Sequence, residues 1–130
     1  MTQQSTYIPG VCNIGKAEVK QRWIAAWVGI ILSVAALLLF ASVPTPWYLK
    51  LLIFLPAVVG ATSLQQALFQ FCVKFGFEGV FNFGAEVGKT DSVEMAEYRR
   101  RDKAKAIRMI VVGLLAALVI TAVALSIPAV

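Results

Sequence analysis

The stretch WIAAWVGIILSVAALLLFASV, from Trp23 to Val43, holds 21 residues without a single charge. A helix of about 20 apolar residues crosses a hydrocarbon core of roughly 30 Å. Basic residues precede the stretch, as they precede the core of a signal peptide, but that core is typically only about 7 to 15 residues long. We therefore predict a retained membrane-spanning helix over 23–43.

Two further apolar segments follow. The second begins at Trp47, acquires glutamines after Leu64, and is predicted to span 47–73. The third covers 107–127, where the hydroxyls of Thr121 and Ser126 can bond back to their own helix. Only Pro44-Thr45-Pro46 separates the first two segments, and prolines end helices. This spacing predicts a tight helical hairpin.

Composition agrees with this pattern. Of the 130 residues, 59% are hydrophobic and only 15% are charged. A soluble domain of this size leaves much of its surface in water, so such a composition excludes an aqueous globular enzyme. The predicted fold class is an all-α membrane protein with three transmembrane helices, a tight outer hairpin between the first two, and a cytoplasmic helical extension of the third.

The absence of histidine narrows the chemistry further. The chain has no His, which removes imidazole ligation of haem or zinc and the Ser-His and Cys-His catalytic pairs. We therefore predict no catalytic residues, no metal site and no enzymatic activity.

The charges predict the orientation. Apart from Lys50, every Lys and Arg lies in the N-terminal segment 1–22, in the loop 74–106 or at their edges. The positive-inside rule places both segments in the cytoplasm and the C-terminal residues 128–130 outside a bacterial inner membrane. Lys50 lies one turn into the second span, where we expect it to snorkel to the outer interface as an anchor.

Small residues recur every four positions in the first and third spans and permit close helix packing. These packing seams are Ala25, Gly29 and Ser33, and Gly113, Ala117 and Thr121. They either hold the three helices together or receive a partner subunit. Pro56 and Gly60 predict a kink in the second span. No Asp or Glu lies within a span, which disfavours ion-coupled transport by one copy and leaves open a pore built from several.

The segment 69–83 is unusual because it holds six of the eight phenylalanines, interleaved with glycines. Such a segment suits the inner membrane interface, either as a bulky anchor or as a docking surface for another membrane subunit, a lipid or a pigment. The candidate docking residues are Phe75, Phe77, Phe81, Asn82 and Phe83. Among them, Asn82 is expected to make a specific polar contact.

A basic helix is predicted after this segment. Asp91 and Glu94 resemble a capping box, helix formers continue from residue 92 to 108, and Glu97 can pair with Arg101. The basic cluster comprises Arg99, Arg100, Arg101, Lys103, Lys105 and Arg108. It is either the topology signal alone or a site for anionic lipid or an acidic partner. Nucleic acid is not predicted, because topology accounts for the net charge.

The two cysteines are candidate reactive thiols. Both Cys12 and Cys72 are predicted to face the cytoplasm, where a structural disulfide is not expected. Cys12 precedes a helix predicted to begin near Lys16, and the helix dipole together with Lys16 and Lys20 would lower the pKa of its thiol.

Part of the chain resembles a known module. The matching features are Asn13-Ile14-Gly15, the basic lead-in through Lys20 and Arg22, two spans with Pro56 and Gly60 in the second, and Phe71-Cys72. Over residues 12–76 this order resembles the small two-helix bacterial inner-membrane domain associated with rhodanese sulfurtransferases. Val73 stands where that family often has proline, and the third helix is additional.

These observations favour a non-catalytic accessory or scaffolding subunit of a larger bacterial inner-membrane complex, with a respiratory or photosynthetic host as one expectation. Its partners would be other integral membrane subunits and lipids, or further copies of the chain, with no cofactor beyond a lipid or pigment at the inner interface. Two alternatives remain open. One is a thiol-based sulfur or redox module that uses Cys12 and Cys72, and the other is a small oligomeric channel or transporter.

Overall fold

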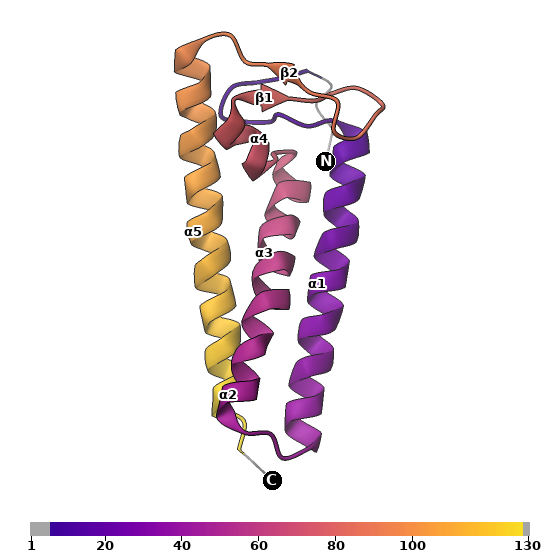
Figure 1. Ribbon diagram of the computed structural model, residues 1–130, viewed down its shortest axis with the longest axis vertical. Coiled ribbons are helices and arrows are strands. Elements are labelled where there is room, and N and C mark those ends of the chain that lie inside the picture. Colours follow the sequence, from indigo (N-terminus) through magenta and orange to yellow (C-terminus); the bar gives the residue numbers. More distant parts are fainter. Residues whose placement is uncertain (1–5, 129–130) are drawn as a thin grey trace.

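Three long helices dominate the computed structural model, which describes residues 6–128 (Figure 1). The first span is α1 (Lys16–Ser42), the second comprises α2 (Trp47–Lys50), the 3₁₀ turn η1 (Leu51–Ile53) and α3 (Phe54–Phe69), and the third is α5 (Ala96–Ser126). All three are long and apolar enough to cross a membrane. The predicted all-α membrane fold is therefore confirmed.

The second span is irregular on the N-terminal side of Pro56. Proline lacks the N–H that would bond to the carbonyl four residues earlier, and the backbone tightens into the 3₁₀ turn η1 just before it. Beyond Pro56, α3 continues through Gly60 to Phe69. The sequence predicts a kink at Pro56 and Gly60. The irregular backbone of this span lies at Leu51–Ile53, on the N-terminal side of both residues.

Lys50 does not serve as the predicted snorkelling anchor. Its side chain is 3% exposed, and its Nζ donates a hydrogen bond of 2.6 Å to the carbonyl of Ile127. Carbonyls at a helix C-terminus lack partners within the helix and attract cations. Lys50 therefore links the hairpin end of the second span to the end of α5. Ala129 and Val130 of the predicted outer tail lie outside the described residues.

In Figure 1, α3 lies between α1 and α5. Gly29 of α1 faces Gly60 of α3 so closely that a Cβ on Gly29 would lie 2.4 Å from the Gly60 nitrogen. On the other side of α3, a Cβ on Gly113 would lie 2.5 Å from Oγ1 of Thr62. The predicted small-residue seams thus bring the helices of this unit together.

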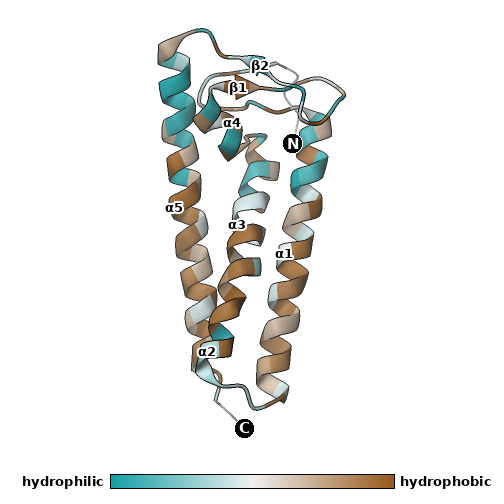
Figure 2. Ribbon diagram, viewed as in Figure 1, coloured by the Kyte–Doolittle hydropathy of each residue, from teal (hydrophilic) through white to brown (hydrophobic). Residues whose placement is uncertain are grey.

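One member of the first seam is displaced. Ala25 is half-buried, whereas Ala26 is 1% exposed. The hydroxyls within the spans bond back as predicted, from Thr121 to the Ala117 carbonyl (2.8 Å) and from Ser126 to the Val123 carbonyl (2.6 Å). Figure 2 shows hydrophobic residues along the middle of all three spans and hydrophilic residues gathered at one end.

That hydrophilic end carries a cap, by which we mean residues 6–15 and 70–95. It contains α4 (Val73–Glu78) and two short antiparallel strands, β1 (Val80–Phe81) and β2 (Asp91–Ser92), which pair Val80 with Ser92 and Phe81 with Asp91. The strands lie across the ends of the long helices (Figure 1).

The cap changes two predicted boundaries. The second span ends at Phe69 rather than at residue 73, because Gln70 adopts a left-handed conformation (φ 52°) that reverses the chain. The third helix begins at Ala96 rather than at residue 92, because Asp91 and Ser92 pair with β1 and cannot cap a helix. Its predicted extension beyond the apolar segment is present.

Candidate functional site

The two segments of the cap are joined through Asn13. Its Nδ2 donates to the Cys72 carbonyl (3.2 Å), and its Oδ1 accepts from the Cys72 N–H (2.7 Å). The Asn82 N–H donates to the Asn13 carbonyl (2.9 Å), and Gly15 donates to the Asn82 carbonyl (2.9 Å). Because Asn13 is fully buried, these bonds fix the N-terminal segment against the loop after α3.

Asn82 makes the specific polar contact that the sequence predicts, and makes it within the chain. Its Nδ2 donates to Oε1 of Glu18 (3.1 Å) and to the Glu86 carbonyl (2.8 Å), while its Oδ1 accepts from the Gly84 N–H (3.0 Å). The same Glu18 oxygen accepts from the Gly88 N–H (2.6 Å). Glu18 and Asn82 are each 2% exposed, so they form the polar interior of the cap.

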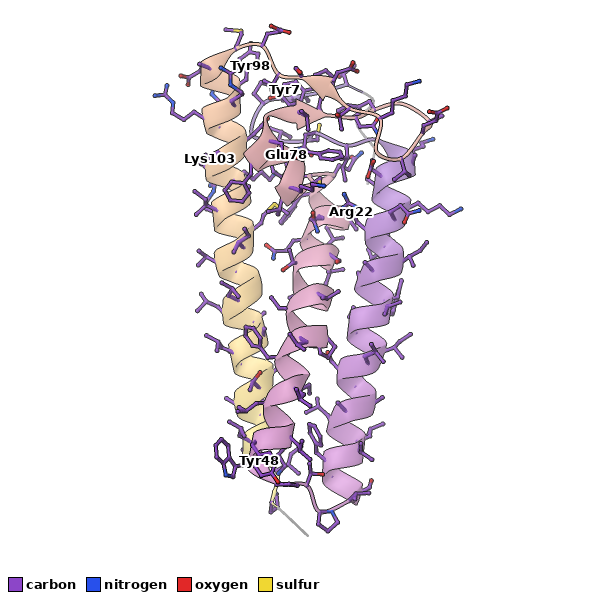
Figure 3. The ribbon with its side chains drawn as sticks, in the orientation of Figure 1. Tyr7, Arg22, Tyr48, Glu78, Tyr98 and Lys103 are labelled. Carbon is purple, nitrogen blue, oxygen red and sulfur yellow. The ribbon has the colours of Figure 1, made fainter. Side chains whose placement is uncertain are left out.

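Arg22 connects this interior to Cys72. Its Nη2 lies 3.4 Å from Oε2 of Glu18 and 3.0 Å from the Cys72 sulfur. Figure 3 shows Arg22 on α1, below the cap. Cys72 is 1% exposed, so the guanidinium contacts a thiol that solvent does not reach.

A second buried acid lies on the opposite side of the cap. Asp102 of α5 is fully buried and accepts from the Tyr7 hydroxyl (2.6 Å) and from the Gly10 N–H (2.8 Å). The Tyr7 ring stacks on Phe81 at 4.9 Å and lies 6.4 Å from the ring of Tyr98 (Figure 3). Burial, together with the hydrogen bond to Asp102, raises the pKa of Tyr7 well above its ordinary value.

The predicted lowering of the Cys12 pKa is wrong. Cys12 is 1% exposed, its sulfur donates to the Thr6 carbonyl (3.4 Å), and burial raises the pKa of its thiol. The positive charge that acts against this increase is that of Lys105 rather than Lys16 or Lys20. Both cysteines are free and buried, an environment that makes thiols inert.

The five candidate docking residues of segment 69–83 differ in their burial. Phe75 and Asn82 lie in the interior, Phe81 and Phe83 are half-buried, and Phe77 is 44% exposed. The surface available to a partner is therefore smaller than the sequence predicts, because most of this segment packs on the helix ends.

Phe77 lies at a hollow between α4 and α5 with a volume of about 290 Å³. Its charged lining residues are Glu78, Arg99, Arg100 and Lys103. Arg99 donates to the carbonyls of Val93 (2.6 Å) and Glu94 (2.8 Å). Lys103 makes no hydrogen bond or ion pair with another described residue. We call Phe77, Arg100 and Lys103 the Phe77 patch.

The basic cluster is thus divided between two faces of α5. Arg101 pairs with Glu97 (3.3 Å), as predicted, and Arg100 also pairs with Glu97. Lys105 and Arg108 lie instead at a groove between α3 and α5. The Lys105 Nζ donates to the Val11 carbonyl (2.8 Å) and lies 5.1 Å from the centre of the Phe69 ring.

Sequence reasoning did not identify the polar contacts of Glu18, Arg22, Asp102 and Tyr7, which join the cap to α1 and α5. Within residues 6–128, no three His, Cys, Asp or Glu side chains are grouped as metal ligands would be. Comparisons with protein-family models, curated proteins and solved structures give no match. The resemblance to the rhodanese-associated membrane domain therefore stays a prediction.

Proposed function

We propose that this protein is a non-catalytic accessory or scaffolding subunit of a larger bacterial inner-membrane complex, and that the Phe77 patch docks a partner subunit. The observation that carries the proposal is the juxtaposition of an exposed phenylalanine with a lysine that has no partner among the described residues, at the rim of a hollow. Aromatic and cationic side chains together are typical of the energetically dominant parts of interfaces.

The cap interior supports this interpretation. The polar groups that catalysis would use are engaged in fastening the cap: Asn13 and Asn82 hold backbone segments, and Glu18 binds Asn82 and Gly88. Both thiols are buried, and burial raises the pKa of Cys12. A polar network of this kind makes the cap rigid, which suits a docking platform more than a site that must admit a substrate.

The position of the patch indicates the chemistry of the partner. Under the positive-inside rule the cap lies in the cytoplasm, where Lys103 and Arg100 would meet an acidic segment close to the membrane. Phe77 adds an apolar contact. We infer that the partner is another integral membrane subunit, with a respiratory or photosynthetic complex as a candidate host.

Site-specific photo-crosslinking tests this proposal. A photoreactive phenylalanine analogue replaces Phe77 in one variant and Val87 in a control, since Val87 is also exposed (52%) but lies in the loop before β2. We expect position 77 to crosslink one membrane protein reproducibly in native membranes, and position 87 not to do so. The charge reversals Arg100→Glu and Lys103→Glu should abolish the product, whereas Lys89→Glu should not.

Two outcomes would contradict the proposal. Equal crosslinking from positions 77 and 87 would indicate random collision in the membrane. Crosslinks only to a second copy of this chain would indicate a homo-oligomer and favour the channel alternative.

A further inference from the structure

A groove runs between α3 and α5 directly beneath the cap, on the face of α5 that carries Lys105. It has a volume of about 440 Å³. Its lining combines cations at the cap end with apolar and neutral side chains towards the membrane: Lys105, Arg108, Phe69, Met109, Val112 and Gln65.

The cations at the groove are only partly neutralised. Arg108 makes no hydrogen bond or ion pair with another described residue. Among the described residues, Lys105 donates one hydrogen bond, to the Val11 carbonyl, although an ammonium carries three donors. The closest acid along α5 is Asp102, whose single negative charge acts on Lys105 and offsets only part of the two positive charges. The groove therefore presents positive charge at one end.

The position of the groove along α5 matches the expected level of the lipid headgroups. The 18 residues of α5 after Arg108 extend about 27 Å, close to the thickness of a hydrocarbon core. A span of this length would place Arg108 and Lys105 near the level of the lipid phosphates, and Val112, about 6 Å further along the helix, towards the acyl chains. Basic pockets between transmembrane helices on the cytoplasmic side are known to bind anionic headgroups.

We propose that this groove binds one anionic phospholipid. Its phosphate lies between Lys105 and Arg108, and one acyl chain follows Phe69, Met109 and Val112. A zwitterionic lipid neutralises its own phosphate, so two cations that share one buried acid, Asp102, favour a headgroup with a net negative charge. Because the groove and the hollow at the Phe77 patch share no lining residue, this lipid site is separate from the proposed docking surface.

Native mass spectrometry of the full chain in mild detergent tests the proposal, with phosphatidylglycerol and phosphatidylcholine as the added lipids. We expect one phosphatidylglycerol to remain bound in preference to phosphatidylcholine. Each cation near a lipid surface contributes about 1 kcal/mol, so Arg108→Gln should weaken binding about fivefold and Lys105→Gln with Arg108→Gln about thirtyfold. Lys103→Gln, on the other face of α5, is the matched control and should have no effect.

A second variant tests the acyl-chain part of the groove separately from its charge. It keeps the proposal testable if the double variant does not fold. Val112→Trp fills the groove from an exposed position and should reduce phosphatidylglycerol binding while leaving the cations in place. Equal retention of both lipids, or loss of binding in Lys103→Gln, would overturn the proposal. Full competition by glycerol phosphate without an acyl chain would show a free-anion site, and an acidic peptide that displaces the lipid would show a protein site. Both would also overturn it.

Discussion

The side chain of Asn82 connects the cap to α1. It is 2% exposed and bonds to Glu18 of α1 and to the loop at Glu86 and Gly84. We predict that Asn82→Ala lowers the stability of the cap by about 1.5–3 kcal/mol, because it removes one of the hydrogen bonds to the buried Glu18 carboxylate, which keeps the Gly88 N–H and Arg22 as partners.

Hydrogen exchange of the backbone amides of residues 80–92 measures this loss. Protection should fall in Asn82→Ala, whereas Lys89→Ala serves as the control because Lys89 and its partner Glu86 are both exposed. Unchanged protection in Asn82→Ala would show that the strand pair holds the loop without the side-chain network.

Tyr7 and Cys12 predict a loss of stability at alkaline pH. Folding raises the pKa of both groups above their ordinary values of 10.0 and 9.0, so the folded state retains protons that the unfolded state releases. Their contribution is fully present below about pH 9 and is lost progressively as the pH rises above it. We expect the thermal midpoint in detergent to fall between pH 9 and pH 11.

Tyr7→Phe isolates the contribution of the tyrosine. This variant should be less stable at neutral pH, by about 1–3 kcal/mol, because Asp102 loses a donor in a buried place. It should also show a shallower decline of the midpoint above pH 10. An identical decline in both proteins would exclude Tyr7 as the titrating group.

At the scale of single residues, the sequence identifies Asn82 from its local context, although its partner Glu18 lies 64 positions away. Asn82 is identified because it is the single polar side chain of residues 80–84, where it lies between Phe81 and Phe83. Asp102 is not identified, since it lies within a basic segment typical of a solvated helix and its partner Tyr7 is 95 positions away. The predicted lowering of the Cys12 pKa is wrong for a related reason, because the burial of this thiol depends on how the cap folds.

At the scale of the helices, the two close glycine contacts differ in what an added methyl would meet. A Cβ on Gly29 would lie 2.4 Å from backbone of α3, whereas a Cβ on Gly113 would meet the Thr62 side chain, which can rotate away. We therefore predict that Gly29→Ala destabilises the bundle by about 1–3 kcal/mol and that Gly113→Ala costs clearly less.

Thermal unfolding in detergent ranks these variants. Ala35→Val, which adds carbon atoms on the exposed face of α1, is the control for a change in hydrophobicity without a contact. If Gly113→Ala proved as damaging as Gly29→Ala, the α3–α5 contact would be as constrained as the α1–α3 contact, which would contradict this prediction.

The length of an apolar segment predicts that a helix is present, whereas contacts with distant parts of the chain determine where that helix ends. The first span was predictable at both ends because Pro44 stops it and the helix starts near Lys16. The cap-side ends of the second and third spans were not predictable. Strand pairing takes Asp91 and Ser92 out of the predicted helix, and Gln70 reverses the chain before residue 73. Lys50 shows a similar effect, because its bond to Ile127 depends on how α5 ends.

At the scale of the whole molecule, the positive-inside rule predicts which end of the bundle faces the cytoplasm, and labelling of introduced cysteines tests it. Both native thiols are buried and should react little, so the labelling of Lys89→Cys in the cap and of Thr45→Cys in the hairpin can be measured separately from theirs. With a membrane-impermeant maleimide on intact spheroplasts, we expect Thr45→Cys to react at once and Lys89→Cys only after permeabilisation. The wild-type chain is the control for Cys12 and Cys72. Labelling at position 89 in intact spheroplasts would show the opposite topology. The Phe77 patch and the lipid groove would then lie at the outer leaflet, away from the cytoplasmic surface potential on which both proposals rest.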